Sequence, residues 1–73
     1  MVYPNPSSGL FTINLKEEAV LIELYNNAGA KIPVTFNQDL NQVKVLKEVS
    51  EGIYYLHILT KSNSNYFKPL IIQ

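Results

Sequence analysis

The residue best suited to acid–base chemistry is the single histidine of the chain, His57, which stands in the stretch YYLHILT. A catalytic histidine needs a carboxylate to orient it and a nucleophile to activate. No acid or serine is close to His57 in sequence, although folding can bring one near. The pattern therefore predicts a polar residue on the outer face of a strand, with Tyr54, Leu56 and Ile58 facing the core.

The acidic residues show no catalytic or metal-binding pattern. Most of them stand in turn-like stretches, and none has the apolar setting that keeps a general acid protonated. The stretch FNQDLNQ has one carboxylate, whereas a calcium loop supplies several. Cysteine is absent, which excludes disulfides and thiolate zinc sites, and there is no glycine-rich phosphate loop. We expect no enzymatic activity, no cofactor and no metal. The acids are Glu17, Glu18, Glu23, Asp39, Glu48 and Glu51.

Charge and length narrow the class of protein further. Six lysines balance six acids and arginine is absent, whereas nucleic-acid binding needs an excess of cations. No apolar stretch approaches the roughly 20 residues that cross a bilayer, so we expect no membrane insertion. With 73 residues, 47% of them hydrophobic, the chain fits one small domain over residues 1–73. Met1 directly precedes the patterned part, and we interpret it as an initiator placed before a domain cut from a longer chain.

Apolar residues alternate with polar ones, which is typical of half-buried strands. The alternation places Val20, Ile22 and Leu24 on one face of a strand, opposite Glu23. Only the stretch LNQVKVLKEVSEG suggests a helix, and a short one. The regular spacing of turn clusters between strands predicts an all-β antiparallel sandwich or small barrel. The strand stretches are GLFTINL, AVLIELY, KIPVTF, VKV, GIYYLHILT and NYFKPLIIQ.

Two prolines and three tyrosines refine this prediction. Pro33 and Pro69 cannot donate to a ladder, so their strands should be edge strands or carry a bulge. Tyr25, Tyr55 and Tyr66 fall on faces that we expect to point outward. Such tyrosines either line the rim of a small sandwich or form a contact with a sugar or a protein. A carbohydrate-binding or adhesive module and a structural spacer therefore stay open as alternatives.

Four motifs in order along the chain carry a family resemblance. VYPNPSSGLF contains Tyr3, Pro4, Asn5, Pro6 and Gly9. LYNNAGAKI contains Tyr25, Asn26 and Gly29, VSEGIYYLHI contains Gly52 and Tyr54, and KPLIIQ contains Lys68. Together they resemble the type A C-terminal sorting domain of proteins exported by the type IX (Por) secretion system. That family more often has a basic or apolar residue at Pro69 and a basic residue at Gln73.

The resemblance implies an immunoglobulin-like β-sandwich of about six to seven short strands. It implies a sorting signal at the end of a precursor whose N-terminal cargo domain passes through the periplasm and then reaches the cell surface or the medium. The partners implied are the outer-membrane type IX machinery and a sortase-like surface protease that removes the domain. The motif residues above are then the candidate recognition residues. From the apolar chain end that Pro69 interrupts, we further hypothesise that the terminal strand, with Lys68 exposed, is an edge offered to a receptor. Free strand edges also allow a weak dimer.

Overall fold

Strands are the only regular elements of the part of the chain that can be described. The computed structural model describes residues 2–3 and 9–73, with side chains from Gly9 onward. The strands are β1 (Val2–Tyr3), β2 (Leu10–Ile13), β3 (Ala19–Tyr25), β4 (Lys31–Ile32), β5 (Val34–Asn37), β6 (Gln42–Val45), β7 (Gly52–Thr60) and β8 (Asn65–Ile72).

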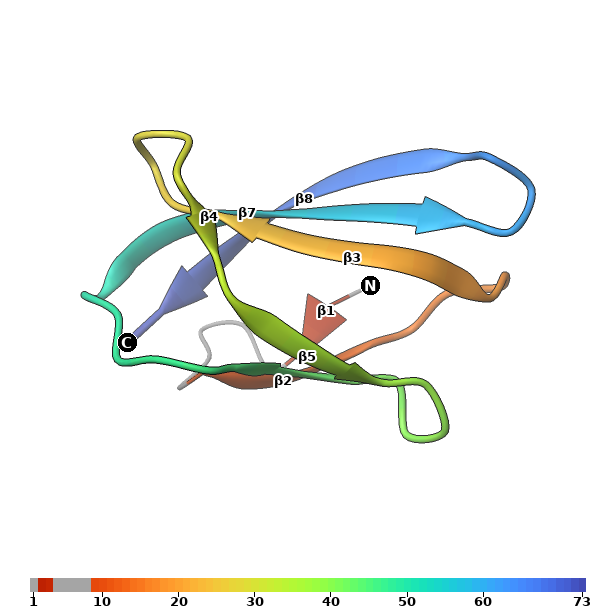
Figure 1. The fold of residues 1–73 in the computed structure, drawn as a ribbon, viewed down its shortest axis with the longest axis horizontal. Coiled ribbons are helices and arrows are strands. Elements are labelled where there is room, and N and C mark those ends of the chain that lie inside the picture. The colour runs from red at the N-terminus through yellow and green to blue at the C-terminus, as the bar shows by residue number, and fades with distance from the viewer. Residues whose placement is uncertain (1, 4–8) are drawn as a thin grey trace.

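The strands form two antiparallel sheets that face each other as two layers (Figure 1). One sheet has the order β1-β2-β6-β5 and the other has the order β4-β3-β7-β8. The predicted all-β, immunoglobulin-like sandwich is thereby confirmed. The strand number is eight within the described residues, because two two-residue strands, β1 and β4, add to the longer ones.

The core lies between the two sheets and is built from alternate residues of each strand. Phe11 and Ile13 of β2 are each 1% exposed, and Leu56 and Ile58 of β7 are fully buried. The predicted inward face of β7 is confirmed, since Tyr54 is also buried. Other members of this core are Ala19, Leu24, Ile32, Val43, Leu70 and Ile72.

Both strand prolines stand at sheet edges, as the sequence predicts. The stretch KIPVTF leaves one sheet after Ile32 and enters the other at Val34, so Pro33 lies where the chain crosses between layers. Pro69 lies in β8, the outermost strand of its sheet, opposite Tyr55. An edge strand leaves one row of N–H groups outside the ladder, which is where proline is tolerated.

Three predictions at the level of single elements are wrong. The pairing of β3 with β7 shifts between Ala19 and Leu21, and this bulge buries Ala19 and leaves Val20 56% exposed. Val20 therefore does not share the inner face of Ile22 and Leu24, because a one-residue shift moves a side chain to the other face. The suggested short helix in residues 40–52 is β6 followed by an irregular segment.

The third correction concerns Tyr66. The β7–β8 register pairs Tyr66 with Ile58, so this tyrosine belongs to the inner side of β8, where the open end of the sandwich leaves it 38% exposed. The turn between Thr60 and Asn65 sets this register, and sequence alternation alone does not show it. Tyr55 does lie on the outer face, as predicted, and is 42% exposed.

Candidate functional site

The turn between β3 and β4 is built by Asn26 and Gly29, two of the motif residues. The side-chain Oδ1 of Asn26 accepts hydrogen bonds from the backbone N–H of Ala28 at 3.0 Å and of Ala30 at 2.8 Å. The backbone N–H of Gly29 donates to the carbonyl of Asn26 at 3.0 Å. Gly29 has a φ of +84°, in the left-handed region that favours glycine. The motif Asn-x-x-Gly therefore encodes a turn that is closed by hydrogen bonds to the side chain and the carbonyl of Asn26.

Tyr54 fixes the segment that leads into β7. Its ring is buried in the core, and its hydroxyl donates to the carbonyl of Ser50 at 2.6 Å. The predicted inward position of Tyr54 is therefore confirmed, and the structure adds a backbone partner for its hydroxyl. Gly52, between the two partners, has a φ of +153°, at the border of the left-handed region. The Gly-x-Tyr motif thus closes a short loop against the start of the strand.

Gly9, the glycine of the first motif, directly precedes β2. Gly9 has a φ of +101°, and its carbonyl accepts a hydrogen bond from the N–H of Val45 at 2.8 Å. A Cβ at this position would lie 3.8 Å from the Cβ of Val45, so space is not what requires glycine here. The backbone conformation is what requires it, because side chains rarely adopt this φ.

These motif residues lie toward one end of the sandwich, where all but Gly29 line one of two hollows. Asn26, Gly52 and Tyr54 line one hollow of about 360 Å³ together with Asn27 and Glu51. Gly9 lines a neighbouring hollow of about 440 Å³ with Ile72, the residue that pairs with Gly52. We name this region the motif end and define it by Gly9, Asn26, Gly29, Gly52 and Tyr54. Figure 1 shows it at the side where β7 begins and the chain reaches its C-terminus.

The other motif residues lie elsewhere. Lys68 is exposed in the middle of β8, opposite Leu56, and lines a separate hollow of about 220 Å³. Tyr25 is the last residue of β3 and faces outward opposite Tyr55. The backbone of Tyr3 pairs with Thr12 in the other sheet, while Pro4, Asn5 and Pro6 lie outside the described residues. The role of all these residues in recognition stays a prediction.

Folding brings to His57 partners that the sequence does not reveal. Its Nδ1 lies 3.1 Å from Oε1 of Glu23, and its Nε2 lies 2.7 Å from Oδ1 of Asn65. The ring stacks on Phe67 with centroids 4.6 Å apart and planes 8° from parallel. The outward position of His57 was predicted, but Glu23 was not predicted as its partner. The pairing of β3 with β7 places Glu23 directly opposite His57. Knowledge of this cross-strand register would have identified Glu23 as the partner of His57.

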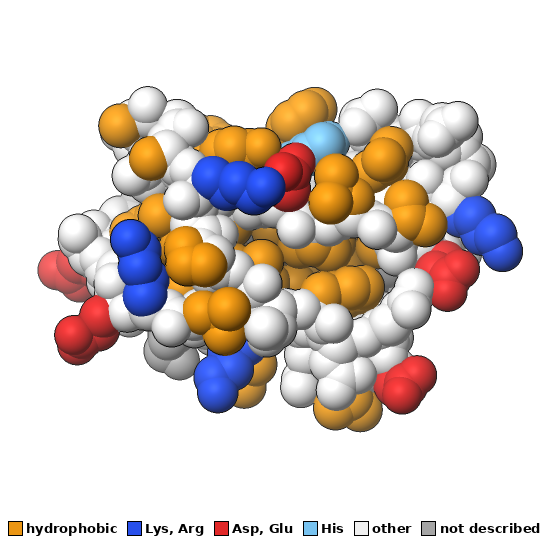
Figure 2. All heavy atoms as spheres, viewed as in Figure 1, with side chains coloured by type: hydrophobic (Ala, Val, Ile, Leu, Met, Phe, Trp, Pro, Cys, Tyr) orange, Lys and Arg blue, Asp and Glu red, His pale blue; other side chains and the backbone are white. Residues whose placement is uncertain are grey.

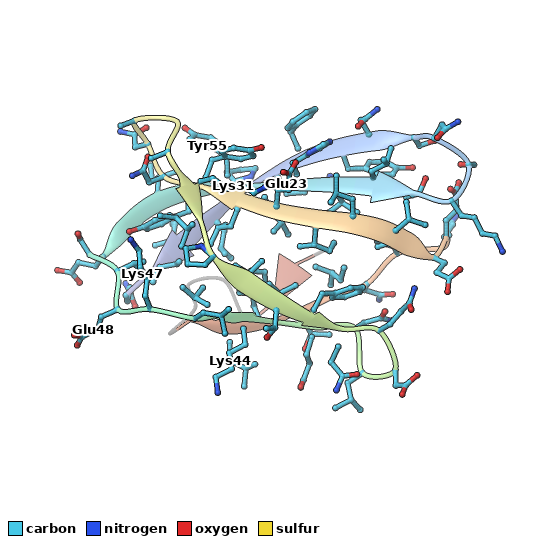
Figure 3. All side chains as sticks on the ribbon, in the orientation of Figure 1. Glu23, Lys31, Lys44, Lys47, Glu48 and Tyr55 are labelled. Atoms are coloured by element: carbon cyan, nitrogen blue, oxygen red, sulfur yellow. The ribbon has the colours of Figure 1, made fainter. Side chains whose placement is uncertain are left out.

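Glu23 is the acid of this cluster, and two basic side chains bind it. Lys31 donates to Oε2 of Glu23 at 2.8 Å, and this bond, helped by His57, lowers the pKa of Glu23 to about 2 (Figure 3). The hydrogen bonds to Asn65 and Glu23 raise the pKa of His57. Both ring nitrogens face acceptor oxygens, and only the protonated imidazole donates from both.

This arrangement suits the holding of a proton rather than catalysis of a reaction. The second hydrogen-bond partner of His57 is the amide of Asn65, not a nucleophile, and within the described residues no group of three His, Cys, Asp or Glu side chains could hold a metal ion. None of the described residues forms a helix long and apolar enough to cross a membrane.

Comparison with known proteins assigns the family. The secretion system C-terminal sorting domain matches residues 1–73. An endo-acting ulvan lyase from Formosa agariphila is 35% identical over an alignment of 74 positions, which covers 99% of this chain and 14% of the lyase. The chain thus spans about one seventh of the length of this curated relative. Because the match extends from end to end, the chain belongs to the family of C-terminal sorting domains that act as signals for type IX secretion.

Proposed function

We propose that this domain carries an N-terminal cargo through the outer-membrane type IX machinery by presenting the motif end for recognition. A type IX sorting tail directs export to the cell surface or the extracellular space. In this proposal the cargo enters the periplasm first, and a sortase-like protease removes the tail after passage. The domain itself performs no catalytic step, and residues 1–73 form one sorting unit.

The observation that carries the proposal is the convergence of motif residues from separate segments. Gly9, Asn26 and Gly52 are far apart in sequence, yet they shape adjoining hollows at one end of the sandwich. Asn26 and Tyr54 bond to backbone atoms there, so they fix the shape of the surface. The exposed side chains on its rim, Asn27 and Glu51, are then free to contact a partner.

Export of a reporter tests the proposal. A periplasm-directed reporter is joined to residues 1–73 in a host that has the type IX machinery, and its amounts in periplasm and medium are measured. We expect the tagged reporter outside the cell and the untagged reporter in the periplasm. Retention of the tagged and folded reporter in the periplasm would refute the proposal.

Rim variants locate the recognition surface. Asn27→Lys with Glu51→Lys changes side chains that line the hollow without removing a bond that closes the turn. Thr35→Lys with Asp39→Lys, at exposed positions of β5 and of the turn that follows it, changes the net charge by the same amount and is the matched control. We expect export of the rim variant to fall at least tenfold at an unchanged melting temperature, while the control stays near wild type. Equal export by both variants would place recognition away from the motif end.

A further inference from the structure

Two edge strands, β1 and β8, border the same side of the sandwich. The chain crosses between the sheets at Pro33, which joins β4 to β5, so β4 and β5 close one side. In Figure 1 β5 lies nearer to the viewer than the paler β1, and Figure 2 shows this near side, where hydrophobic side chains occupy the space between the layers. The strands at the opposite edges of the two sheets, β1 and β8, then face each other across the other side.

The inner side of β8 is buried over only part of its length. The pairing with β7 places Tyr66 and Lys68 on the same side as Leu70, because alternate residues of a strand share a face. Leu70 is fully buried, whereas Tyr66 is 38% exposed and Lys68 is also exposed. The opposing edge strand, β1, has two residues against eight in β8, which explains the uneven cover.

A hollow of about 220 Å³ lies at the uncovered part of β8. Thr60, Tyr66 and Lys68 line it from one sheet, and residues 14–17, which follow β2, line it from the other. We name it the β8 hollow. Leu15 packs against the core there and, with Tyr66, makes part of the lining apolar. A cavity of about 150 Å³ holds benzene, so the β8 hollow has room for one or two aliphatic side chains.

The register of β1 leads the preceding chain toward this hollow. β1 pairs antiparallel with β2, and Val2 stands opposite Ile13. Each step toward the N-terminus therefore moves one residue along the segment that follows Ile13, and that segment, residues 14–17, lines the β8 hollow. A residue two positions before Val2 would stand opposite Leu15 and would point to the inner side, as Leu15 and the buried Ile13 do.

The rim of the β8 hollow favours acidic over basic ligands. Lys16 and Lys68 are exposed there. The carboxylate of Glu17 accepts a hydrogen bond from the hydroxyl of Ser62, so it is already engaged within the domain. Opposite charges attract and like charges repel at this distance, so an acidic residue in a segment bound here would be stabilised and a lysine or arginine would not.

We propose that the β8 hollow binds the chain segment that directly precedes this domain in its parent protein, as an extension of β1. This inference rests on the proposed function, in which a cargo lies N-terminal to residues 1–73. The bound segment is extended, carries an apolar residue opposite Leu15 and has acidic rather than basic residues near Lys68. Lys68 then acts by holding this segment, separately from the motif end.

Two extensions of equal composition test the inference. Thr-Val-Thr-Val or Val-Thr-Val-Thr is added before residue 1, and only the first order turns its valines inward, with one opposite Leu15, because a one-residue shift moves every side chain to the other face. We expect the first chain to melt at least about 4 °C above the second. Nuclear Overhauser contacts between the Tyr66 ring and valine methyls should appear only in the first. In Tyr66→Ser the difference in melting temperature should fall by at least half.

Disulfide trapping measures the register directly, because the chain contains no cysteine. A cysteine two positions before Val2 is combined with Leu15→Cys or, as the matched control, with Lys16→Cys. Directly opposite residues of an antiparallel pair have Cβ atoms about 4.5–5.5 Å apart, close to the distance that a disulfide needs. In a glutathione buffer we expect the equilibrium constant for disulfide formation to be at least fivefold larger for the first pair.

The outcomes separate this inference from the proposed function. Equal melting temperatures of the two extended chains, or equal disulfide constants of the two pairs, overturn the inference, whatever the export of the reporter shows. A difference in melting temperature that persists undiminished in Tyr66→Ser places the segment away from the β8 hollow and also overturns it. The expected results in both assays, together with failure of the wild-type tail to export the reporter, overturn the proposed function alone.

Discussion

The hydroxyl of Tyr54 provides a test of how the motif end is stabilised. Tyr54 is 6% exposed, and its hydroxyl donates a 2.6 Å hydrogen bond to the carbonyl of Ser50. In Tyr54→Phe the ring stays in the core and only this bond is lost. A buried hydrogen bond contributes about 0.5–1.5 kcal/mol net. Ser50 is exposed, so its carbonyl can be rehydrated, and we expect a loss of about 1 kcal/mol.

Urea unfolding followed by far-ultraviolet circular dichroism measures this loss. For a domain of this size, 1 kcal/mol corresponds to a decrease in melting temperature of about 4–8 °C. Tyr55→Phe is the matched control, since its ring is 42% exposed and its hydroxyl has no partner in the described part of the chain. We expect the control to stay within about 0.5 kcal/mol of wild type. Equal losses for the two variants would refute the role of the Tyr54–Ser50 bond.

The same variant separates stability from recognition. Domains of 73 residues have unfolding free energies of about 4–11 kcal/mol, so a loss of about 1 kcal/mol leaves more than about 99% of the chains folded. Export of a reporter carrying Tyr54→Phe should therefore equal wild type. If the folded variant failed to export, the hydroxyl would itself be recognised, and its assignment as a fold-forming group would be wrong.

Three further predictions follow from the turn and from the histidine cluster. Gly29→Ala should cost about 1–2 kcal/mol in urea unfolding because of its φ of +84° alone, as no atom lies within 4 Å of the added Cβ, and Gly29→Asn should cost less. The raised pKa of His57 means that the native state holds this proton more tightly than the unfolded state, whose value is about 6.5. The stability of wild type over His57→Gln should therefore be largest below pH 6.5 and decrease as pH rises through the native pKa. The pKa of Glu23 is lowered to about 2, so its effect on stability depends on pH in the opposite direction. The extra stability of wild type over Glu23→Gln should be complete above pH 4.5 and should disappear as pH falls toward 2.

Sequence patterns predicted which residues of β7 face the core, because every second residue of a half-buried strand is buried. The alternation in GIYYLHILT identified Tyr54, Leu56 and Ile58 as core residues, and all three are buried. Asn26 and Gly29 were identified through the family resemblance, and the turn that they close involves only residues within four positions of each other. These features need no knowledge of which strands pair.

Features that depend on pairing were missed. Val20 is exposed because of a bulge that arises only when β3 meets β7, and Tyr66 turns inward because of the β7–β8 register. The His57–Glu23 contact joins residues 34 positions apart. No single-strand pattern contains this information, because register is set by the facing strand and by turn length.

The residues that carry the family resemblance and the residues suited to binding are largely different. Asn26, Gly29, Gly52 and Tyr54 act through backbone geometry or bonds to backbone, which any member with the same turns requires. The side chains that face solvent around them, such as Asn27 and Ile53, are set by no such requirement. The motif therefore specifies the shape of one end of the sandwich and leaves the chemistry of the neighbouring surface to residues outside it.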